Sequence, residues 1–358
     1  MMKDLDHIAR LQLPIYIIGA GGIVNDAHLP AYQKAGFRVQ GITDLDPAKA
    51  RATAARWDIP EVFLSIEEMI AVLPADAVVD IAVPAPALAD ILERLPNGIP
   101  VLFQKPMGAD LSEARRILKI CRDRHLLAAV NFQLRYAPFI LEVKRMMAAG
   151  MLGQLNDIEV NVNVYTPWHL WDFLSVSPRV EILYHSIHYV DLVRHLIGEP
   201  ASVHAHTNKH PSMPHLASVR SSIIMDYGDM VRANILTNHC HDFGTPNQYS
   251  YIKIEGDRGA VIIHFGALID YPRGAPDRFS FTTIEDGVVQ PWQTIEIPGS
   301  WFPDAFIGPM ASLMQAAVGI VDLPDNTVED CIHTMACVEA AYDSSRQGGV
   351  RPAHDFGR

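Results

Sequence analysis

A glycine-rich turn in residues 14–32 (PIYIIGAGGIVNDAHLPAY) constrains the fold of this chain more than any other feature. An apolar, strand-like run ends at Gly19, which permits a tight turn, and Gly21 lacks the Cβ that would keep a phosphate away from the backbone. The N–H groups of the helix that starts next supply hydrogen-bond donors and a positive dipole end. The segment predicts a dinucleotide-binding turn made by Gly19, Gly21, Gly22, Ile23 and Val24.

Asp44 ends the next strand-like run, FRVQGITD, at about the 20-residue spacing that separates the glycines from an acidic residue in dinucleotide-binding folds. A carboxylate there bonds the ribose 2′-hydroxyl of NAD. Position 45 is Leu, so a 2′-phosphate would meet a carboxylate without a guanidinium beside it. The sequence therefore favours NAD over NADP, although Val24 stands where the usual motif has glycine or alanine.

Length and charge limit the class of protein. The chain has 358 residues, 49% of them hydrophobic, which is enough for two domains. A formal net charge of −12 disfavours a nucleic-acid or membrane partner, because both require basic patches. Residues 1–14 carry acids and lack the apolar centre of a signal peptide, and no uncharged apolar run reaches about 18 residues, so we expect a cytoplasmic protein.

Cysteine and histidine spacings indicate no metal site and no disulfide framework. The four cysteines match neither a disulfide pattern nor a Cys-x-x-Cys zinc site, and we expect small buried thiols. None of the histidine groupings has an established ligand spacing, so we expect no bound metal. The cysteines are Cys121, Cys240, Cys331 and Cys337.

Strand-like and helical segments alternate up to about residue 130, as in a doubly wound parallel sheet. Ser65 and Glu68 have the spacing of a capping box at the start of one of these helices. Later β-rich segments follow one another without helices, which favours an antiparallel sheet. We predict a Rossmann domain over residues 1–130 and a substrate-binding and oligomerisation domain over 131–358. Helices are expected at 138–149, 184–197, 305–320 and 327–346.

Several stretches, in this order along nearly the whole chain, resemble the Gfo/Idh/MocA oxidoreductases. They include the glycine turn, VLFQKPMGADLSEAR, NFQLRYAP and the helix text HYVDLVRHLIGEP. The resemblance implies a Rossmann domain, a C-terminal α+β domain with an open, mostly antiparallel sheet, and homodimers or homotetramers packed through that sheet. Within the family, GAGGIVNDAHLPAY and YHSIHYVD are most similar to the D-apiose dehydrogenases.

Lys105 follows a predicted parallel strand, beside the crevice where such sheets bind ligands. The family pattern there is Glu-Lys-Pro, and Gln104 replaces the glutamate in this chain. Without a neighbouring carboxylate, burial lowers the pKa of Lys105 more freely. The resemblance places the catalytic histidine at His188, whose imidazole suits a general base at neutral pH.

Tyr184 departs from the family pattern, which has Asp four residues before the catalytic histidine. The two side chains share a helical face, but a phenol carries no negative charge at neutral pH. Tyr184 can position a sugar hydroxyl without raising the basicity of His188 or Lys105. His185 is the first substitute for the missing acid and Glu181 a weaker one, whereas Asp191 is expected to be structural.

The remaining pocket candidates are polar or aromatic residues near predicted loop ends. Indole faces pack against the C–H side of sugars, and carboxylates and amides bond hydroxyl groups. The predicted substrate-binding residues are Asn131, Arg135, Trp168, His169, Asp172, Trp301 and Asp304, and Pro84 and Gln104 are further predicted cofactor contacts.

Together these features predict an NAD-dependent dehydrogenase that acts on the CH–OH group of a small sugar or polyol. Oxidation of an aldose at its anomeric carbon releases one proton and gives a lactone, so a single base suffices. This favours a small aldose, with apiose first, over an inositol or another polyol. Two other classes stay open, namely a non-catalytic NAD-binding sensor and a hydrolase or isomerase that uses NAD as an internal redox relay.

Overall fold

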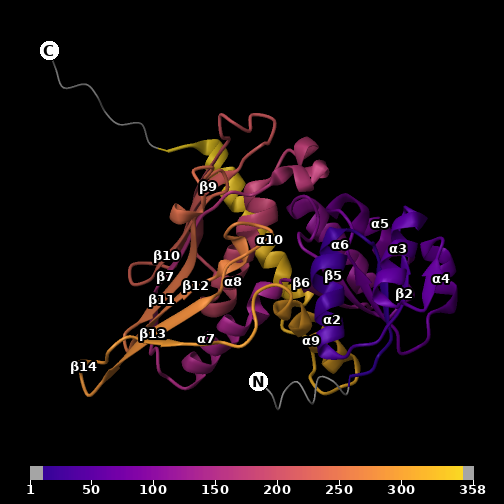
Figure 1. The fold of residues 1–358 in the computed structure, drawn as a ribbon, viewed down its shortest axis with the longest axis horizontal. Helices are drawn as coiled ribbons and strands as arrows, with labels where there is room; N and C mark the ends of the chain where they lie inside the picture. Colours follow the sequence, from indigo (N-terminus) through magenta and orange to yellow (C-terminus); the bar gives the residue numbers. More distant parts are fainter. Residues whose placement is uncertain (1–10, 350–358) are drawn as a thin grey trace.

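The computed structural model describes residues 11–349, which form two sheets lying side by side with helices packed on them (Figure 1). The first sheet has six parallel strands in the order β3-β2-β1-β4-β5-β6. The strand order reverses between β1 and β4, and a ligand crevice opens at the carboxyl ends of strands at such a point. The predicted Rossmann sheet is confirmed. Its strands are β1 (Ile15–Ile18), β2 (Val39–Thr43), β3 (Glu61–Phe63), β4 (Val78–Ile81), β5 (Pro100–Gln104) and β6 (Leu127–Asn131).

The helices between these strands begin where the sequence supplies caps. Ser65 accepts a hydrogen bond from the N–H of Glu68, as the capping box predicts, and Asp46 and Asp110 cap two other helices in the same way. The chain leaves β1 through a π-helical turn, η1, rather than a regular helix. The elements are η1 (Val24–His28), α2 (Leu29–Ala35), α3 (Pro47–Trp57), α4 (Ile66–Val72), α5 (Ala85–Arg94) and α6 (Leu111–Asp123).

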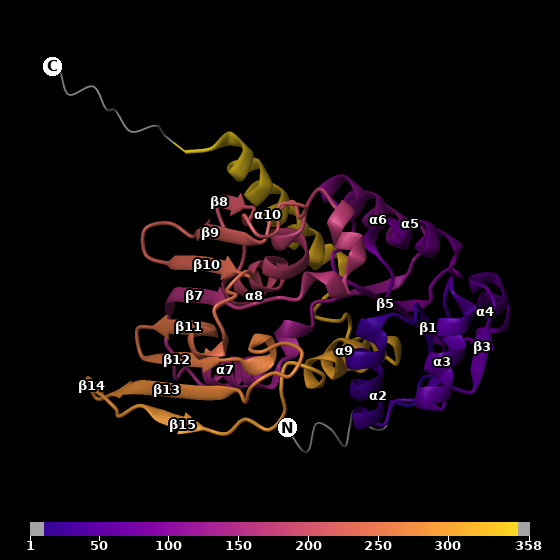
Figure 2. The same cartoon turned by 45° about the horizontal axis from the view of Figure 1, so that its top comes forward.

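The second sheet has nine strands, eight of them in the order β14-β13-β12-β11-β7-β10-β9-β8, with β15 paired to β13 (Figure 2). Only β7 and β10 pair in parallel, so the expected mostly antiparallel sheet is confirmed. The strands are β7 (Leu155–Asn163), β8 (Ser202–Asn208), β9 (Arg220–Asp226), β10 (Arg232–Asn238), β11 (Tyr249–Gly256), β12 (Gly259–His264), β13 (Arg278–Glu285), β14 (Val288–Val289) and β15 (Gln293–Ile295).

Helices cover one face of the second sheet and separate it from the Rossmann sheet (Figure 1). Alternating burial along β9 and β10 shows that one set of side chains faces these helices while the other stays exposed. The helices are α7 (Pro138–Ala148), α8 (Ile187–Ile197) and α10 (Val328–Gln347), close to three of the expected ranges. None of the helices between residues 11 and 349 combines the length and apolar character that a membrane span requires.

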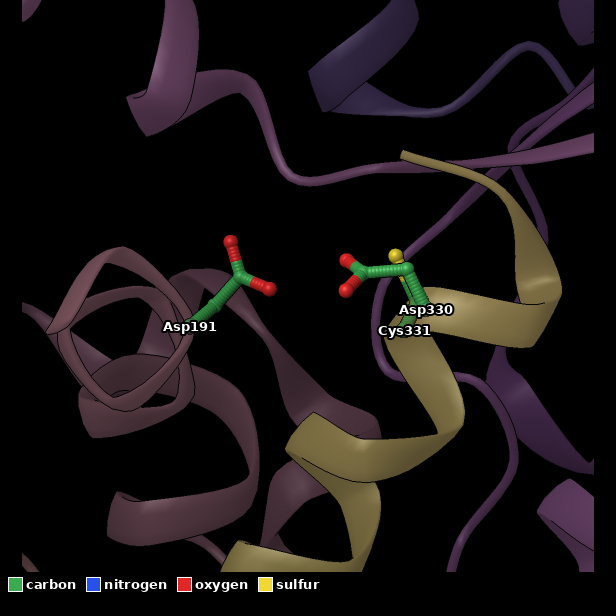
Figure 3. Close-up of side chains that lie close together, drawn as sticks. All are labelled: Asp191, Asp330 and Cys331. Carbon is green, nitrogen blue, oxygen red and sulfur yellow. The ribbon is translucent and has the colours of Figure 1, made fainter. Parts of the chain in front are cut away.

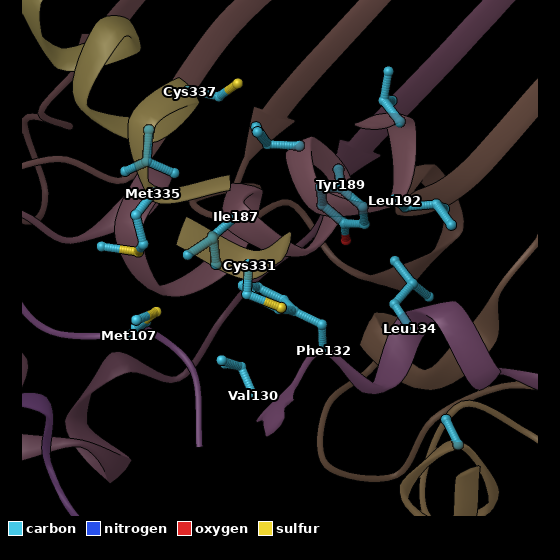
Figure 4. Close-up of a cluster of buried hydrophobic side chains, with 14 of the residues drawn as sticks. Met107, Val130, Phe132, Leu134, Ile187, Tyr189, Leu192, Cys331, Met335 and Cys337 are labelled. Carbon is cyan, nitrogen blue, oxygen red and sulfur yellow. The ribbon is translucent and has the colours of Figure 1, made fainter. Parts of the chain in front are cut away.

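The cores of the two halves are continuous. Figure 4 shows side chains near β6 meeting others from α8 and α10, among them Phe132, Tyr189 and Met335. All four cysteines are free and buried, as expected. Helix α9 (Ile307–Ala317) packs back onto β5 and β6 of the Rossmann sheet, so part of the C-terminal segment contributes to the first core. The division at residue 130 stays a prediction.

Arg135 links three elements at this junction. The sequence predicts that it binds substrate, but its side chain is buried and bonded to acidic residues. It lies in the 3-10 turn η2 (Gln133–Tyr136), 1% exposed, and its Nε and Nη2 donate to the Asp191 carboxylate at 2.7 and 2.5 Å. Nη2 also donates to Asp330 Oδ2 at 2.6 Å. Figure 3 shows the carboxylates of Asp191 and Asp330, with Cys331, facing one another from α8 and α10. The guanidinium bonds both carboxylates, so this acidic group is part of the packing.

Arg135→Met should therefore destabilise the protein by about 3–5 kcal/mol, because it leaves the buried Asp191 without its ion-pair partner. Urea unfolding followed by circular dichroism measures this loss. Arg116→Met is the matched control, since Arg116 pairs with Asp90 and Glu93 on the exposed surface and its removal should leave the unfolding midpoint unchanged. Equal effects of the two substitutions would contradict the structural role of Arg135.

Candidate functional site

A cavity of about 2260 Å³ opens at the carboxyl ends of the Rossmann strands, between the two halves of the molecule. One wall holds the glycine turn, Asp44 and Lys105, and the opposite wall holds Tyr184 and His188. Its volume exceeds the roughly 300–1,000 Å³ of a typical pocket for one small ligand. The cavity has room for a dinucleotide and a small substrate together.

The glycine turn has the geometry that a pyrophosphate needs. Gly19 has a φ of +111°, and a Cβ there would lie 2.4 Å from the carbonyl oxygen of Ala82, so no other residue fits. Gly21 borders the cavity, and a Cβ on it would meet no protein atom within 4 Å. That space is left for a phosphate beside the backbone. Gly22 and Ile23 also line the cavity, whereas Val24 is fully buried against the sheet and is not a cofactor contact.

Asp44 is fixed at the tip of β2 by two backbone N–H groups. Ala20 N donates to its Oδ2 at 2.7 Å and Asp46 N to its Oδ1 at 2.8 Å. Leu45 beside it is fully exposed and lines the same cavity, as do Pro84 and Lys49. The carboxylate therefore borders the same cavity as the glycine turn, and its contact with the ribose stays a prediction. Lys49 is a cation in this wall that the sequence pattern did not indicate.

Lys105 bridges the two halves of the site. Its Nζ donates to the main-chain oxygen of Tyr184 at 2.5 Å, across the cavity from β5 to the start of the histidine helix. Burial lowers the pKa of Lys105 from 10.5 to about 7, and no carboxylate opposes that shift. A backbone carbonyl holds the amine without favouring its charged form as strongly as an aspartate would. Lys105 can thus exchange a proton near neutral pH.

The histidine helix begins with a π-helical turn, η5 (Ile182–Ser186), a feature often found at functional sites. Within it, Tyr184 packs edge-on against Phe173, and burial raises the pKa of its phenol. His185 contacts the ring of His239 at 4.4 Å between centroids, and burial together with His239 lowers its pKa well below the usual value. Both residues line the cavity, and neither carries a charge at neutral pH, while their catalytic roles stay predictions.

His188 is buried in the first turn of α8 and lines the cavity. The ring of Trp301 packs edge-on against it with centroids 5.6 Å apart. Burial first, and the nearby charge of Lys105 second, hold the pKa of His188 well below its usual value. Its Nδ1 has no hydrogen-bond partner among residues 11–349. The imidazole is therefore neutral and able to accept a proton.

Gln104 is held from behind by a buried histidine and aspartate that sequence analysis did not identify. Its Nε2 lies 2.5 Å from His28 Nε2, and His28 Nδ1 lies 2.6 Å from Asp80 Oδ2. Because a carboxylate only accepts, His28 carries its proton on Nδ1 and accepts from the Gln104 amide. Asn131 approaches the same His28 nitrogen at 3.4 Å and does not line the cavity, so the expected substrate contact is not met. The sequence feature that could have indicated this buried pair is the aspartate, Asp80, inside the apolar strand VVDI.

Two of the seven predicted sugar contacts, Asp172 and Trp301, line the cavity, and five do not, namely Asn131, Arg135, Trp168, His169 and Asp304. Trp168 is buried behind His185, and its place in the wall is taken by Trp171, three residues later. His169 is exposed outside the cavity, and Asp304 caps its own loop by accepting from Ser300 N at 2.8 Å while pairing with Lys34. Cavity residues that the sequence did not indicate include Gln133, Thr166, Trp171, Phe173, Tyr271 and Asp277.

Two family models together match most of the chain. The model described as "Oxidoreductase family, NAD-binding Rossmann fold" matches residues 13–132, and that described as "Oxidoreductase family, C-terminal alpha/beta domain" matches residues 144–352. Both belong to the Gfo/Idh/MocA family. The cofactor of the first domain is thus NAD, as the glycine turn and Asp44 predicted.

Individual relatives are distant but cover almost the full chain. A D-apiose dehydrogenase of Rhizobium rhizogenes is 22% identical over 93% of this chain and 95% of its own. A D-xylose 1-dehydrogenase (NADP(+)) of Haloferax volcanii is 23% identical over 93% and 98%. The crystal structure of an oxidoreductase from Agrobacterium radiobacter in complex with NAD+, L-tartaric acid and magnesium superposes with a TM-score of 0.77, at 20% identity and over 94% and 97% of the two chains. This last match shows the shared fold.

The lowered pKa of Lys105 has a consequence for stability. Between about pH 7 and 10.5 the unfolded chain retains a proton on Lys105 that the folded chain has lost, so the free energy of unfolding rises with pH in this window. Lys105→Met removes this contribution. Its stability relative to wild type should fall as pH rises, by up to about 1.4 kcal/mol per pH unit.

Urea unfolding of both proteins across this pH window measures the effect without substrate or cofactor. Lys119→Met, on the exposed face of α6, is the matched control and should follow the wild-type curve in parallel. A constant difference between Lys105→Met and wild type at every pH would show that the Lys105 pKa is not lowered.

Proposed function

Because the chain belongs to the Gfo/Idh/MocA family of oxidoreductases, we propose that it is an NAD-dependent dehydrogenase that oxidises a small aldose at C1 to a lactone. The observation that carries the proposal is the pairing of Lys105 and His188 in one cavity with the glycine turn, each with its pKa lowered by burial. Apiose is the first candidate substrate. The apiose and xylose dehydrogenases among the relatives support an aldose.

The oxidation removes one proton and one hydride from the sugar, and different groups accept each of them. Bound NAD supplies the hydride acceptor. His188, kept neutral by burial, takes the proton of the anomeric hydroxyl, and the Lys105 amine donates a hydrogen bond to the oxygen on which charge develops. Tyr184 and Asp172 orient other hydroxyl groups, and the Trp301 indole covers His188 and keeps water away.

We also propose that the protein is cytoplasmic and assembles as a homodimer or homotetramer through the open face of the second sheet. Apolar side chains that this face exposes, such as Ile224 and Leu236, support a packed interface. The competing proposals are an inositol or polyol dehydrogenase and a non-catalytic NAD-binding sensor. Replacement of the family aspartate by Tyr184 is the observation that favours the sensor.

The deciding experiment is a screen of aldoses, branched pentoses, inositols and sugar acids with NAD, following NADH absorbance and identifying products by NMR. A lactone from a small aldose is expected. Efficient oxidation of an inositol with no lactone from any aldose would overturn the proposal. Tight NAD binding without NADH from any compound would favour the sensor, and turnover without net NADH would favour an internal redox relay.

We expect a preference for NAD over NADP of at least about tenfold in kcat/KM, or 1.4 kcal/mol, because Asp44 bonds a ribose diol and repels a 2′-phosphate. Asp44→Ser combined with Leu45→Arg should move the preference towards NADP. Leu45→Arg alone is the control, since the Asp44 carboxylate remains. Equal efficiency of the wild-type protein with both cofactors would be the contrary result.

His188→Asn should lower turnover by roughly 10²–10⁴, the usual contribution of a positioned base, while leaving NAD affinity within a few-fold. Steady-state kinetics gives the first quantity and isothermal titration calorimetry the second. His215→Asn in the exposed loop between β8 and β9 serves as the control and should leave both unchanged. Near-wild-type turnover of His188→Asn would remove His188 from the mechanism.

A further inference from the structure

Thr166 lies in the cavity wall, and its hydroxyl forms a hydrogen bond with the protein behind that wall. It follows β7 in the sequence, lines the cavity and is 6% exposed. Its Oγ1 lies 2.9 Å from Nδ1 of His239, and its N–H donates to the His239 carbonyl at 3.1 Å. The side chain is thus fixed by His239 on the side away from the cavity.

His239 faces a buried acid on its other side. It is fully buried just after β10, and its Nε2 lies 3.5 Å from Oε1 of Glu181, which is also fully buried. Burial opposes ionisation of Glu181, but hydrogen bonding from His239, Ser221 and Ser186 holds the pKa of that carboxyl below its usual value. Ser186 Oγ donates to the same Oε1 at 2.7 Å. Glu181 is therefore a carboxylate, and it can only accept.

The Glu181 carboxylate decides which nitrogen of His239 holds the proton when the ring carries only one. Nε2 faces that carboxylate at 3.5 Å, longer than the roughly 2.7–2.9 Å of a charge-assisted bond, and the ring of His185 lies against His239. A neutral ring that faces a carboxylate carries its proton on Nε2, which leaves Nδ1 to accept from the Thr166 hydroxyl. The same logic orients the histidine in a Ser-His-Asp triad. Thr166 then has only lone pairs left for a ligand.

We propose that Thr166 is a specificity-determining residue that accepts a hydrogen bond from one non-reacting hydroxyl of the sugar, in an orientation set by His239 and Glu181. This inference rests on the proposed function, because it assumes a hydroxylated substrate in this cavity. A site of this kind selects strongly for its hydroxyl, since a substrate without that group leaves the Thr166 oxygen buried and unpaired. His239 and Glu181 act through Thr166 and are positioning residues.

The kinetic test compares the parent sugar with its monodeoxy analogues. Thr166→Val should lower kcat/KM for the parent by roughly 10- to 100-fold but leave it unchanged for the one analogue that lacks the partner hydroxyl. Thr166→Ser should restore discrimination against that analogue. Thr207→Val on β8, which removes a hydroxyl outside the cavity, is the matched control and should match wild type on every sugar. An equal loss on all sugars with Thr166→Val would show that Thr166 only packs.

A second measurement does not depend on activity. ¹⁵N NMR of the cofactor-free protein should show His239 as the neutral Nε2–H form, and Glu181→Gln should change the signals of its ring nitrogens. A doubly protonated or Nδ1–H ring would reverse the direction of the Thr166 bond and overturn the proposal. If the wild-type protein oxidises no sugar, the proposed function fails, whereas an active wild type with uniform losses in Thr166→Val refutes this inference alone.

Discussion

The amine of Lys105, withdrawn from water at the seam between the two sheets, is the interaction on which the site depends. A charged lysine without a carboxylate is costly to bury, and the protein compensates with a single backbone acceptor, the oxygen of Tyr184. The same contact ties the end of β5 to the start of the histidine helix. The position of the proposed base His188 relative to the nucleotide-binding sheet therefore depends on this lysine as well as on packing.

The role of Tyr184 follows from that contact. An aspartate at this position would attract the proton of Lys105 and keep the amine charged. The tyrosine contributes its main-chain oxygen to Lys105 and its ring to Phe173, and it adds no charge beside the amine. Two further acids lie one layer deeper, where Glu181 faces His239 and Asp80 faces His28. These two acids reach the cavity wall through their histidines and the neutral residues Gln104 and Thr166.

Sequence patterns predicted the residues whose roles follow from their place on the backbone. Gly19 and Asp44 end parallel strands, Lys105 follows another, and such ends meet at one edge of the sheet. Which face an irregular segment presents is a different matter. The segment around Trp168 forms short 3-10 turns without a helical or strand period, so the sequence gives no means to decide that Trp171 lines the cavity and Trp168 does not.

Long-range pairing was the other property that the sequence did not reveal. Arg135 is of a residue type that often binds ligands, and only the fold shows that it pairs with Asp191 on a different helix. Likewise, His28 and Asp80 are far apart in the chain and meet because β1 and β4 are neighbours in the sheet. In both cases the order of the strands and helices in space decides which residues meet. A single sequence therefore shows the residue types but not which residue each one pairs with.

The continuity of the two cores limits how the cavity can open. One cluster of buried side chains runs from Ile81 in the Rossmann sheet to Ile263 in the second sheet, and α9 returns to pack on the first. Domains joined through a large apolar interface do not open as a hinge without exposing it. The cavity wall away from the sheets consists of connecting segments, including residues 166–177 and 266–277. An opening of the cavity that keeps the shared core intact would therefore have to come from these segments and not from a hinge between the two sheets.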